Sequence, residues 1–446
     1  MKKLGYLVMC LLVTIAAQAQ DQKEIDFVEY DLDNGLHVIL HQDNSTPIVA
    51  VTMMYHVGSK NEDPQRTGFA HFFEHLLFEG SKNIDRGEYA KIVERAGGQW
   101  NANTSQDRTF YYEVLPSNRL ELGLYLESER LLHAKIDSTG VETQREVVKE
   151  EKRQRYDNQP YMTFAQEIFK RAYTEHPYRW TPIGSMEDLD AATMEEFMDF
   201  YKKFYVPNNA VLSIAGDLDI DDTRELVEKY FSEIPRGTME IPRPDVVEPA
   251  QAEEIRDVIY DDIQLPAVFH AYHMPAQGTD DYYALSMLTQ VLSGGPSARL
   301  NKQLVDKQQK ALQVFAFPYA LENPGLFITL GITNIGITPE ELESAIDAEF
   351  ESVQEELITE REFQKIRNQI EVDFVSQNSR VAGVAESLAD YHMYFGDANL
   401  INTEIEKFMD VTREDLKRVA NKYLTKENRV VLYYLPKSEN NQTQSN

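Results

Sequence analysis

Residues 68–80 read Gly-Phe-Ala-His-Phe-Phe-Glu-His-Leu-Leu-Phe-Glu-Gly, and this stretch decides how the rest of the chain is interpreted. Apolar residues fill both of its sides, which predicts a buried helix ending at Gly80. His71 and His75 are four residues apart, so they lie on one face of that helix. Two imidazoles one turn apart can bind a single metal ion, and zinc favours nitrogen ligands. Glu74 lies beside His75 and can act as general base on a metal-bound water, in the inverted zincin order His-x-x-Glu-His.

The alternative is a metal-free helix whose two histidines are only hydrogen-bonded. Two imidazoles and a carboxylate in so apolar a segment would then be hard to satisfy, and this favours the metal.

A catalytic zinc site needs a third protein ligand and leaves its fourth position to water. Residues 141–155 predict an amphipathic helix. Its inward stripe is Val141, Gln144, Val147, Val148 and Glu151. Its outer side holds Arg145, Glu146, Lys149 and Lys152. An acid on a buried helix face is unusual unless it is paired or bound to metal, so Glu151 is the predicted third ligand and Glu150 is the alternative.

Residues 99–108 are polar and lead into an apolar segment, 109–115, that predicts a strand. The polar stretch predicts either a sheet edge next to the metal or an ordinary turn before a core strand. An edge strand can bind an extended peptide by main-chain pairing, and Asn101 would then be placed to hold a substrate carbonyl.

The first residues predict export. Lys2 and Lys3, an apolar core over 4–16 and the Ala17-Gln18-Ala19 cleavage site are typical of a signal peptide over residues 1–19. Cys10, the only cysteine, falls within it, so we expect an exported, periplasmic chain without disulfides. The formal net charge of -30 argues against nucleic acid and anionic membrane surfaces as partners. No later segment is long and apolar enough to predict a membrane span.

Three segments together resemble the pitrilysin–insulinase family of zinc peptidases. They are residues 68–75, the stretch from Gly97-Gly98 to Thr104, and residues 145–151 (Arg-Glu-Val-Val-Lys-Glu-Glu). The chain is most similar to the single-repeat bacterial and mitochondrial processing peptidase-like branch, and His176-Pro177-Tyr178 and residues 205–209 fit the same resemblance.

The resemblance implies one zinc ion per chain, with His71, His75 and Glu151 as ligands and Glu74 as base. It also implies that Asn101 and Ala102 contact the substrate backbone. Many relatives carry a second glutamate seven residues before the third ligand, where this chain has Gln144. A neutral amide there can still orient the site by hydrogen bonding.

The second half of the sequence is a diverged copy of the first. Thr193 and Thr412, Asn209 and Asn428, and Pro47 and Pro266 are all separated by 219 residues. We therefore predict an α+β protein with two homologous α/β-roll domains, each a mixed, largely antiparallel sheet covered by helices, of the processing-peptidase metallohydrolase fold. The predicted divisions are a catalytic domain over 20–234, a proline-rich linker over 235–252, an inactive repeat over 253–436 and a disordered tail over 437–446.

In the copied metal helix, predicted at 286–295, Ser286, Thr289 and Gln290 replace His71, Glu74 and His75, so the second domain cannot bind the metal in the same way. The family also uses an Arg and a Tyr seven residues apart to stabilise the developing carbonyl charge. Val305 and Leu312 occupy those two places here. We therefore expect a dimer in which a related chain supplies the Arg/Tyr pair, the alternative being a homodimer.

Together these features predict an exported zinc metalloendopeptidase that cuts short or unfolded peptides, with Glu74 as base. The alternative is a catalytically silent structural or peptide-binding subunit of the same fold.

Overall fold

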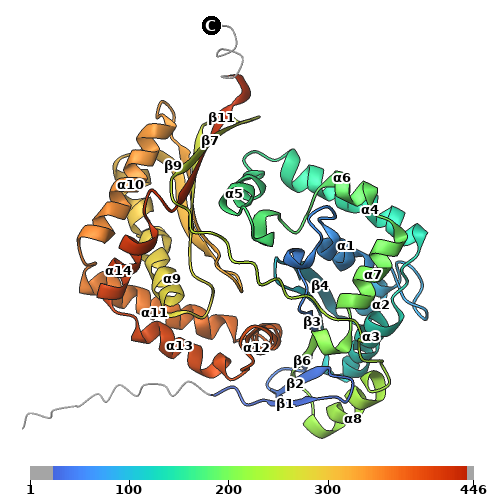
Figure 1. Cartoon of the computed structure of the whole chain (residues 1–446). Coiled ribbons are helices and arrows are strands. Elements are labelled where there is room, and N and C mark those ends of the chain that lie inside the picture. Colours follow the sequence, from blue (N-terminus) through green and yellow to red (C-terminus); the bar gives the residue numbers. More distant parts are fainter. Residues whose placement is uncertain (1–23, 439–446) are drawn as a thin grey trace, which may run out of the picture.

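The computed structural model describes residues 24–438 and shows two lobes side by side, each built on one sheet (Figure 1). The predicted signal peptide and all but two residues of the predicted tail lie outside this range. Within it, no helix combines the length and the apolar character needed to cross a bilayer.

The first sheet is mixed and largely antiparallel, as predicted. In spatial order its strands are β1 (Val28–Asp31), β2 (His37–Gln42), β6 (Ala210–Gly216), β3 (Ile48–Tyr55), β5 (Thr109–Pro116) and β4 (Gln99–Thr104). Only the β2–β6 pair is parallel. β1 and β2 pair antiparallel as a hairpin, and the polar stretch from residue 99 forms the edge strand β4 rather than an ordinary turn.

The second sheet repeats this order without a counterpart of β1. Its strands are β7 (Ile255–Asp261), β11 (Arg429–Pro436), β8 (Ala267–His273), β10 (Leu326–Thr333) and β9 (Ala311–Tyr319). The β7–β11 pair is again the parallel one. The repeat extends to single hydrogen bonds, because the amide of Asn209 donates to Phe204 O and that of Asn428 to Tyr423 O, both at 2.8 Å. The prediction of two homologous sheet-and-helix halves is confirmed.

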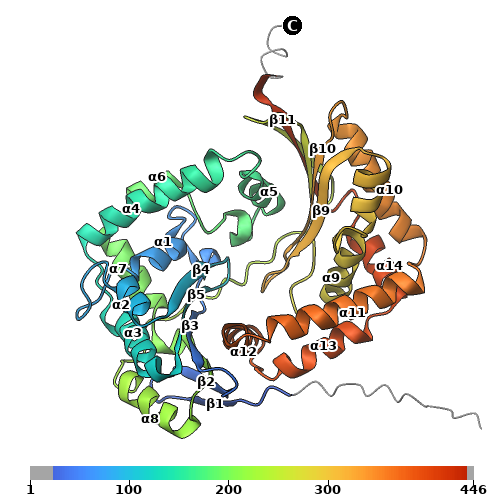
Figure 2. The same ribbon diagram turned by 180° about the vertical axis from the view of Figure 1, so that it is seen from behind.

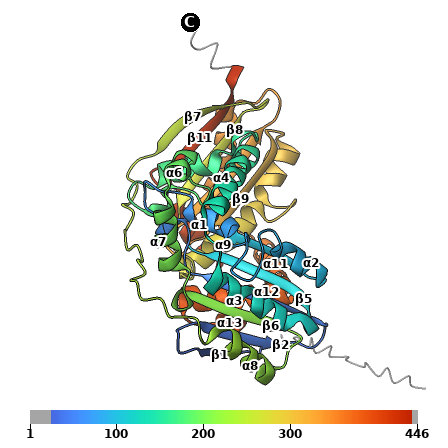
Figure 3. The same cartoon turned by 90° about the vertical axis from the view of Figure 1, so that its right-hand side faces the viewer.

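The helices follow the same repeat. In the first half they are α1 (Phe69–Leu76), α2 (Tyr89–Arg95), α3 (Leu120–His133), α4 (Ser138–Lys152), α5 (Phe164–Ala172), α6 (Met186–Ala191), α7 (Met194–Phe204) and α8 (Ile220–Phe231). In the second half they are α9 (Asp280–Ser293), α10 (Pro339–Glu355), α11 (Glu360–Gln377), α12 (Val381–Phe395), α13 (Leu400–Asp410) and α14 (Arg413–Tyr423). Between α8 and β7 the chain has no helix or strand and runs along one side of the molecule (Figure 3).

Each half covers one face of the other half's sheet. Most first-half helices pack on one face of the first sheet, whereas α12 packs on its other face, beside β3 and β2 in Figures 1 and 2. There Leu388 of α12 meets Ile39 and Met54 of the sheet. In return α5 packs on the second sheet, where the rings of Phe164 and Phe269 stack with centroids 5.1 Å apart. Because β3 is covered on both faces, its side chains are apolar on both.

Two details of the predicted helices are wrong. The metal helix ends at Leu76, and the chain reaches Gly80 through turns instead of helix. On α4 the side chain of Arg145 is buried and Val147 is 43% exposed, which reverses their predicted sides. Arg145 points inward because its guanidinium lies over the ring of Phe197 and donates to Ala192 O at 3.4 Å.

A largely buried ionic cluster joins the first half to Glu322 of the second half. Lys60 Nζ lies 2.8 Å from Asp107 Oδ1 and also pairs with Glu322, which accepts from His56 Nε2 at 2.9 Å. The backbone N–H of Glu322 donates to Asp107 Oδ2 at 3.0 Å. Burial would raise the pKa of the Glu322 carboxyl, but the hydrogen bond and charge of His56, with Lys60, hold it at about 2.

We expect Glu322→Gln to lower the free energy of unfolding by about 1–3 kcal/mol at pH 7, because the ammonium of Lys60 and the imidazole of His56 lose a charged acceptor. The folded-state pKa of Glu322 lies below its usual 4.5, so its contribution is present above that value and is lost as pH falls toward 2. Urea unfolding from pH 7 to 3 measures this. The variant should lose less stability over the acid range than the native chain, and Glu356→Gln, at an exposed carboxylate, should match the native chain. Equal acid sensitivity of Glu322→Gln and native protein would contradict the assignment.

Candidate metal centre

Helix α1 presents the two histidines from a tightly fixed position. Its start is set by Gly68, whose φ of 95° suits glycine, and by buried Glu62, which accepts hydrogen bonds from the N–H groups of Gly68 and Ala70 at 2.9 and 2.8 Å. The two histidines are only partly buried, whereas four apolar side chains of α1 are buried: Phe69, Phe72, Phe73 and Leu76.

The last turn of α4 brings Glu151 against both histidines. Glu151 Oε2 lies 3.6 Å from His71 Nε2 and 3.1 Å from His75 Nε2. Glu150, the alternative ligand, instead faces solvent, where it pairs with Arg153 at 3.3 Å. A π-helical turn over Arg153–Asp157 follows directly, a feature that recurs at functional sites. The structure therefore assembles the three predicted ligands and excludes Glu150 from the cluster.

The charges of this cluster suit a cation. Burial, followed by the nearby charge of His75, lowers the pKa of His71 to about 4, so its ring is neutral at pH 7 and keeps a lone pair. The imidazole of His75, whose Nε2 lies 3.1 Å from Glu151 Oε2, is the main group that lowers the pKa of Glu151, which is therefore ionised. Arg155 Nη1 binds the other oxygen of Glu151 at 2.7 Å.

The fit of these residues to a metal can be tested on their unpaired atoms. Glu151 Oε2 is buried without a hydrogen-bond partner and lies against the Nε2 atoms of both histidines. Ligand atoms of His71, His75 and Glu151 all lie within 4.8 Å of one another. Two imidazoles and one carboxylate are the donor set of catalytic zinc sites, so the residues fit zinc.

Glu74, the predicted base, stands beside the cluster. Burial raises the pKa of Glu74, and a hydrogen bond from Thr104 Oγ1 to Glu74 Oε2, 2.5 Å long, opposes that rise. Sequence reasoning missed Thr104. The alternation of side chains along a strand could have identified it. Trp100, Ala102 and Thr104 share one face of β4, and Trp100 on that face packs on Phe78 just beyond α1.

The two predicted substrate-binding residues lie on opposite faces of β4. Ala102 shares the face of Thr104, toward α1, while Asn101 is exposed on the other face. The outer edge of β4 has no partner strand in the part of the chain that the structure describes. Main-chain contact at this edge therefore suits both residues, whereas the Asn101 side chain does not join the metal cluster.

Gln144 lies two turns before Glu151 on α4. Its amide Nε2 donates to Glu79 Oε1 at 2.5 Å, and Glu79 also pairs with Arg86. Gln144 therefore links α4 to the segment just after α1 and helps hold the two ligand-bearing helices together.

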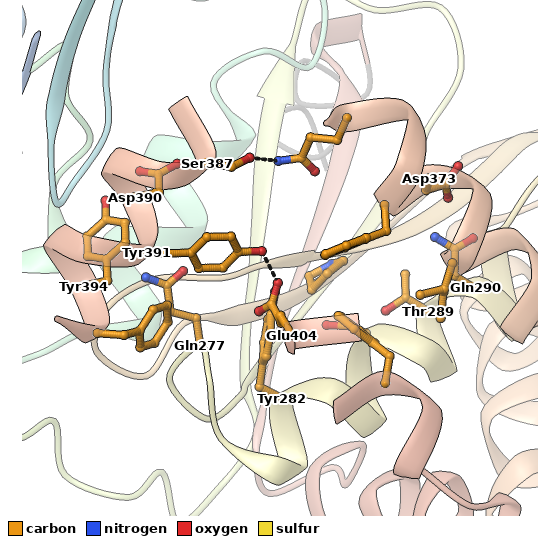
Figure 4. Close-up of a pocket in the computed structure, with 17 residues that line it drawn as sticks. Gln277, Tyr282, Thr289, Gln290, Asp373, Ser387, Asp390, Tyr391, Tyr394 and Glu404 are labelled. Carbon is orange, nitrogen blue, oxygen red and sulfur yellow. Dashed lines mark hydrogen bonds between the residues drawn. The ribbon is translucent and has the colours of Figure 1, made fainter. Parts of the chain in front are cut away.

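The second half has a cavity where the first half has its metal cluster (Figure 4). Its volume is about 380 Å³, and its lining includes Ser286, Thr289 and Gln290 of α9, with Ile370 of α11 at the repeat position of Glu151. Figure 4 shows Tyr391 donating to Glu404 across this cavity. No histidine is among the residues that line it.

Comparisons with known proteins agree with this arrangement. Residues 37–184 match the family model described as Insulinase (Peptidase family M16), and residues 191–370 match the one described as Peptidase M16 inactive domain. The zinc protease PqqE of Helicobacter pylori is 34% identical over 426 residues, which cover 95% of this chain and 96% of PqqE. An uncharacterized zinc protease of Mycobacterium leprae, ML0855, is 26% identical over 400 residues, covering 89% of this chain and 88% of its own.

Solved structures share the fold. The crystal structure of a protease from Helicobacter pylori aligns with a TM-score of 0.89 at 33% identity, over 92% of this chain and all of the other. The periplasmic protease PqqL from Escherichia coli aligns with a TM-score of 0.76 at 18% identity, over 93% of this chain but only 48% of PqqL.

We expect Glu151→Gln to lose one zinc ion per chain relative to the native chain, because a neutral amide is a poor substitute for the carboxylate ligand. The matched control is Glu150→Gln, which removes the neighbouring carboxylate and should keep the native zinc content. Elemental analysis of both purified variants after gel filtration measures this. Zinc loss in the Glu150 variant with zinc retention in the Glu151 variant would show that Glu150, and not Glu151, is the third ligand.

Proposed function

The chain belongs to the insulinase family, peptidase family M16, and from that premise we propose that it is a zinc metalloendopeptidase hydrolysing peptide bonds in short or unfolded peptides. The observation that carries the proposal is the convergence of His71, His75 and Glu151 with a hydrogen-bonded base, Glu74, beside them. A retired site would have no chemical reason to keep all four groups.

Each residue has a role that follows from its surroundings. Zinc held by the three ligands would lower the pKa of a water and polarise the scissile carbonyl. Glu74 accepts the proton of the attacking water and then passes it to the leaving amine. Its raised pKa suits both transfers near neutral pH, and Thr104 orients its carboxylate for them.

The free edge of β4 is the proposed substrate platform. An extended peptide pairing with it would lie along the strand that carries Thr104, so its main chain would pass the base. This is the basis on which Asn101 and Ala102 are proposed to contact the substrate backbone. Main-chain pairing needs an extended, unfolded substrate, and this supports the proposed substrate class.

Export and pairing are further parts of the proposal. The sequence pattern of residues 1–19 supports export to the periplasm, and the structural relative PqqL is itself described as periplasmic. This chain corresponds in fold to about half of PqqL, which supports a working unit of two such chains. We propose a dimer with a related chain that supplies an Arg/Tyr pair, because Val305 and Leu312 offer no charge or hydroxyl at the places that the family uses.

We expect Glu74→Gln to reduce cleavage of an unstructured, quenched fluorescent peptide by about 10²–10⁴-fold while zinc content and peptide binding persist, because only the proton acceptor is removed. Turnover by the purified native chain that stops with a chelator would establish a self-sufficient peptidase and exclude the silent-subunit alternative. Zinc binding without turnover would require the related chain to be added before the test is repeated. Unchanged turnover by Glu74→Gln would contradict its role as base.

We expect Thr104→Val to lower kcat about tenfold and to move the acid limb of the kcat/KM profile to higher pH. The Thr104 hydroxyl lowers the pKa of Glu74, so its loss raises that pKa, and a base with a higher pKa is protonated at higher pH. Thr104→Ser keeps the hydroxyl and should keep the native profile. A limb that moves to lower pH in the valine variant would contradict the hydrogen-bond assignment.

A further inference from the structure

A second group of metal-binding side chains lies far from α1 in the sequence and the fold. Glu29 of β1, His37 of β2 and His392 of α12 place ligand atoms within 4.8 Å of one another. Among residues 24–438, this group and the cluster of His71, His75 and Glu151 are the two sets of three that meet this condition. The second group therefore connects the first sheet to α12, the second-half helix that packs on it.

The two groups share a donor set and its spacing. In the second group, Glu29 Oε2 lies 3.3 Å from His37 Nε2 and 3.8 Å from His392 Nδ1. The corresponding distances from Glu151 Oε2 are 3.1 and 3.6 Å. Ligand atoms about 2.0–2.1 Å from a tetrahedral zinc ion stand about 3.3–3.4 Å apart, so both groups are near the required size.

The hydrogen bond between His37 and Asp31 determines which nitrogen of the neutral His37 ring carries the proton. Asp31 Oδ1 lies 2.8 Å from His37 Nδ1, and a carboxylate only accepts, so Nδ1 carries the proton in the neutral ring. Nε2 then turns a lone pair toward the oxygen of Glu29. Two acceptors that face each other need either a proton on Nε2, which would make the 3.3 Å contact a hydrogen bond, or a metal cation between them. The arrangement carboxylate–histidine–cation is the one that orients histidine ligands in zinc sites.

A proton alone accounts poorly for the rest of the group. The rings of His37 and His392 stack with centroids 3.3 Å apart and planes 10° apart, so protonating both would place two positive charges face to face. The 3.8 Å between His392 Nδ1 and Glu29 Oε2 is too long for a hydrogen bond. One divalent ion would satisfy all three groups at once, after the rings rotate out of the stack.

The ion would have a path and a favourable field. His37, His392 and Asp31 line a cavity of about 220 Å³, which Arg243 also lines. The guanidinium of Arg243 donates to His56 O at 2.5 Å and to Asn209 Oδ1, and its positive charge opposes the negative charges of the carboxylates. Asp31 and Glu29 are partly exposed and bring two negative charges to the side that an ion would enter.

We propose that this chain binds a second zinc ion through His37 Nε2, His392 Nδ1 and Glu29, with Asp31 orienting His37. The ion would cross-link the β1–β2 hairpin to α12 and thereby stabilise the packing of the second half on the first sheet. The site is structural and independent of the proposed peptidase activity.

The test is zinc stoichiometry in the full-length chain, measured by elemental analysis after zinc loading and gel filtration. We expect two zinc ions in the native chain, one in His392→Gln, one in His71→Gln and none in the double variant. His41→Gln is the matched control, because His41 also lies on β2 but is bonded to the backbone O of Asp26, and it should keep two. Circular dichroism checks that each variant is folded.

A second readout does not depend on counting ions. In the His71→Gln background, added zinc should raise the unfolding temperature, since an ion bound only by the folded state stabilises it, and His392→Gln should abolish the rise. One zinc in the native chain and none in His71→Gln would overturn the proposal, as would two zinc ions in His392→Gln. Peptide cleavage by His392→Gln, measured separately, keeps a failure of this site distinct from a failure of the catalytic one.

Discussion

The exchange of one helix between the halves is the constraint on which the rest of this structure depends. Neither sheet is covered on both faces by its own half, so α12 and α5 must cross. This exchange holds the two lobes side by side (Figure 1). Separating the lobes would expose the apolar faces of both sheets to water, at about 25 cal/mol for each Å². The lobes are therefore one cooperative unit, despite their repeated sequence.

The metal centre shows how an apolar setting creates reactivity. Burial keeps His71 neutral and makes Glu74 a stronger base, while nearby histidines keep Glu151 ionised. The same burial would be costly without a cation, because unpaired polar atoms would remain. Rigid placement comes from the start of α1, where Glu62 accepts two backbone N–H groups, and from the link between Gln144 and Glu79.

Local periodicity was enough to predict much of this site, and it failed where distant segments meet. Helical spacing distinguished Glu151 from Glu150, and the repeat predicted two similar sheets. The pattern of α12 is amphipathic, but this pattern does not indicate which sheet the apolar face packs on. The exchange of helices was therefore not predicted. Arg145 and Val147 were assigned to the wrong sides because a guanidinium over an aromatic ring can replace an apolar side chain on a buried face. His37 and His392 meet only through the exchange, and no local signal connects them.

The exchanged helix also sets the order in which this chain can fold. Ile39 and Met54 belong to the first strands that are synthesised, yet their cover, Leu388, is among the last segments to be made. The first sheet is complete once β6 has been made, so one of its apolar faces lacks its cover until α12 follows. Contacts between residues so far apart close a very long loop, which slows folding and leaves the intermediate prone to aggregation. The completion of α12 is therefore the step that removes this apolar face from water.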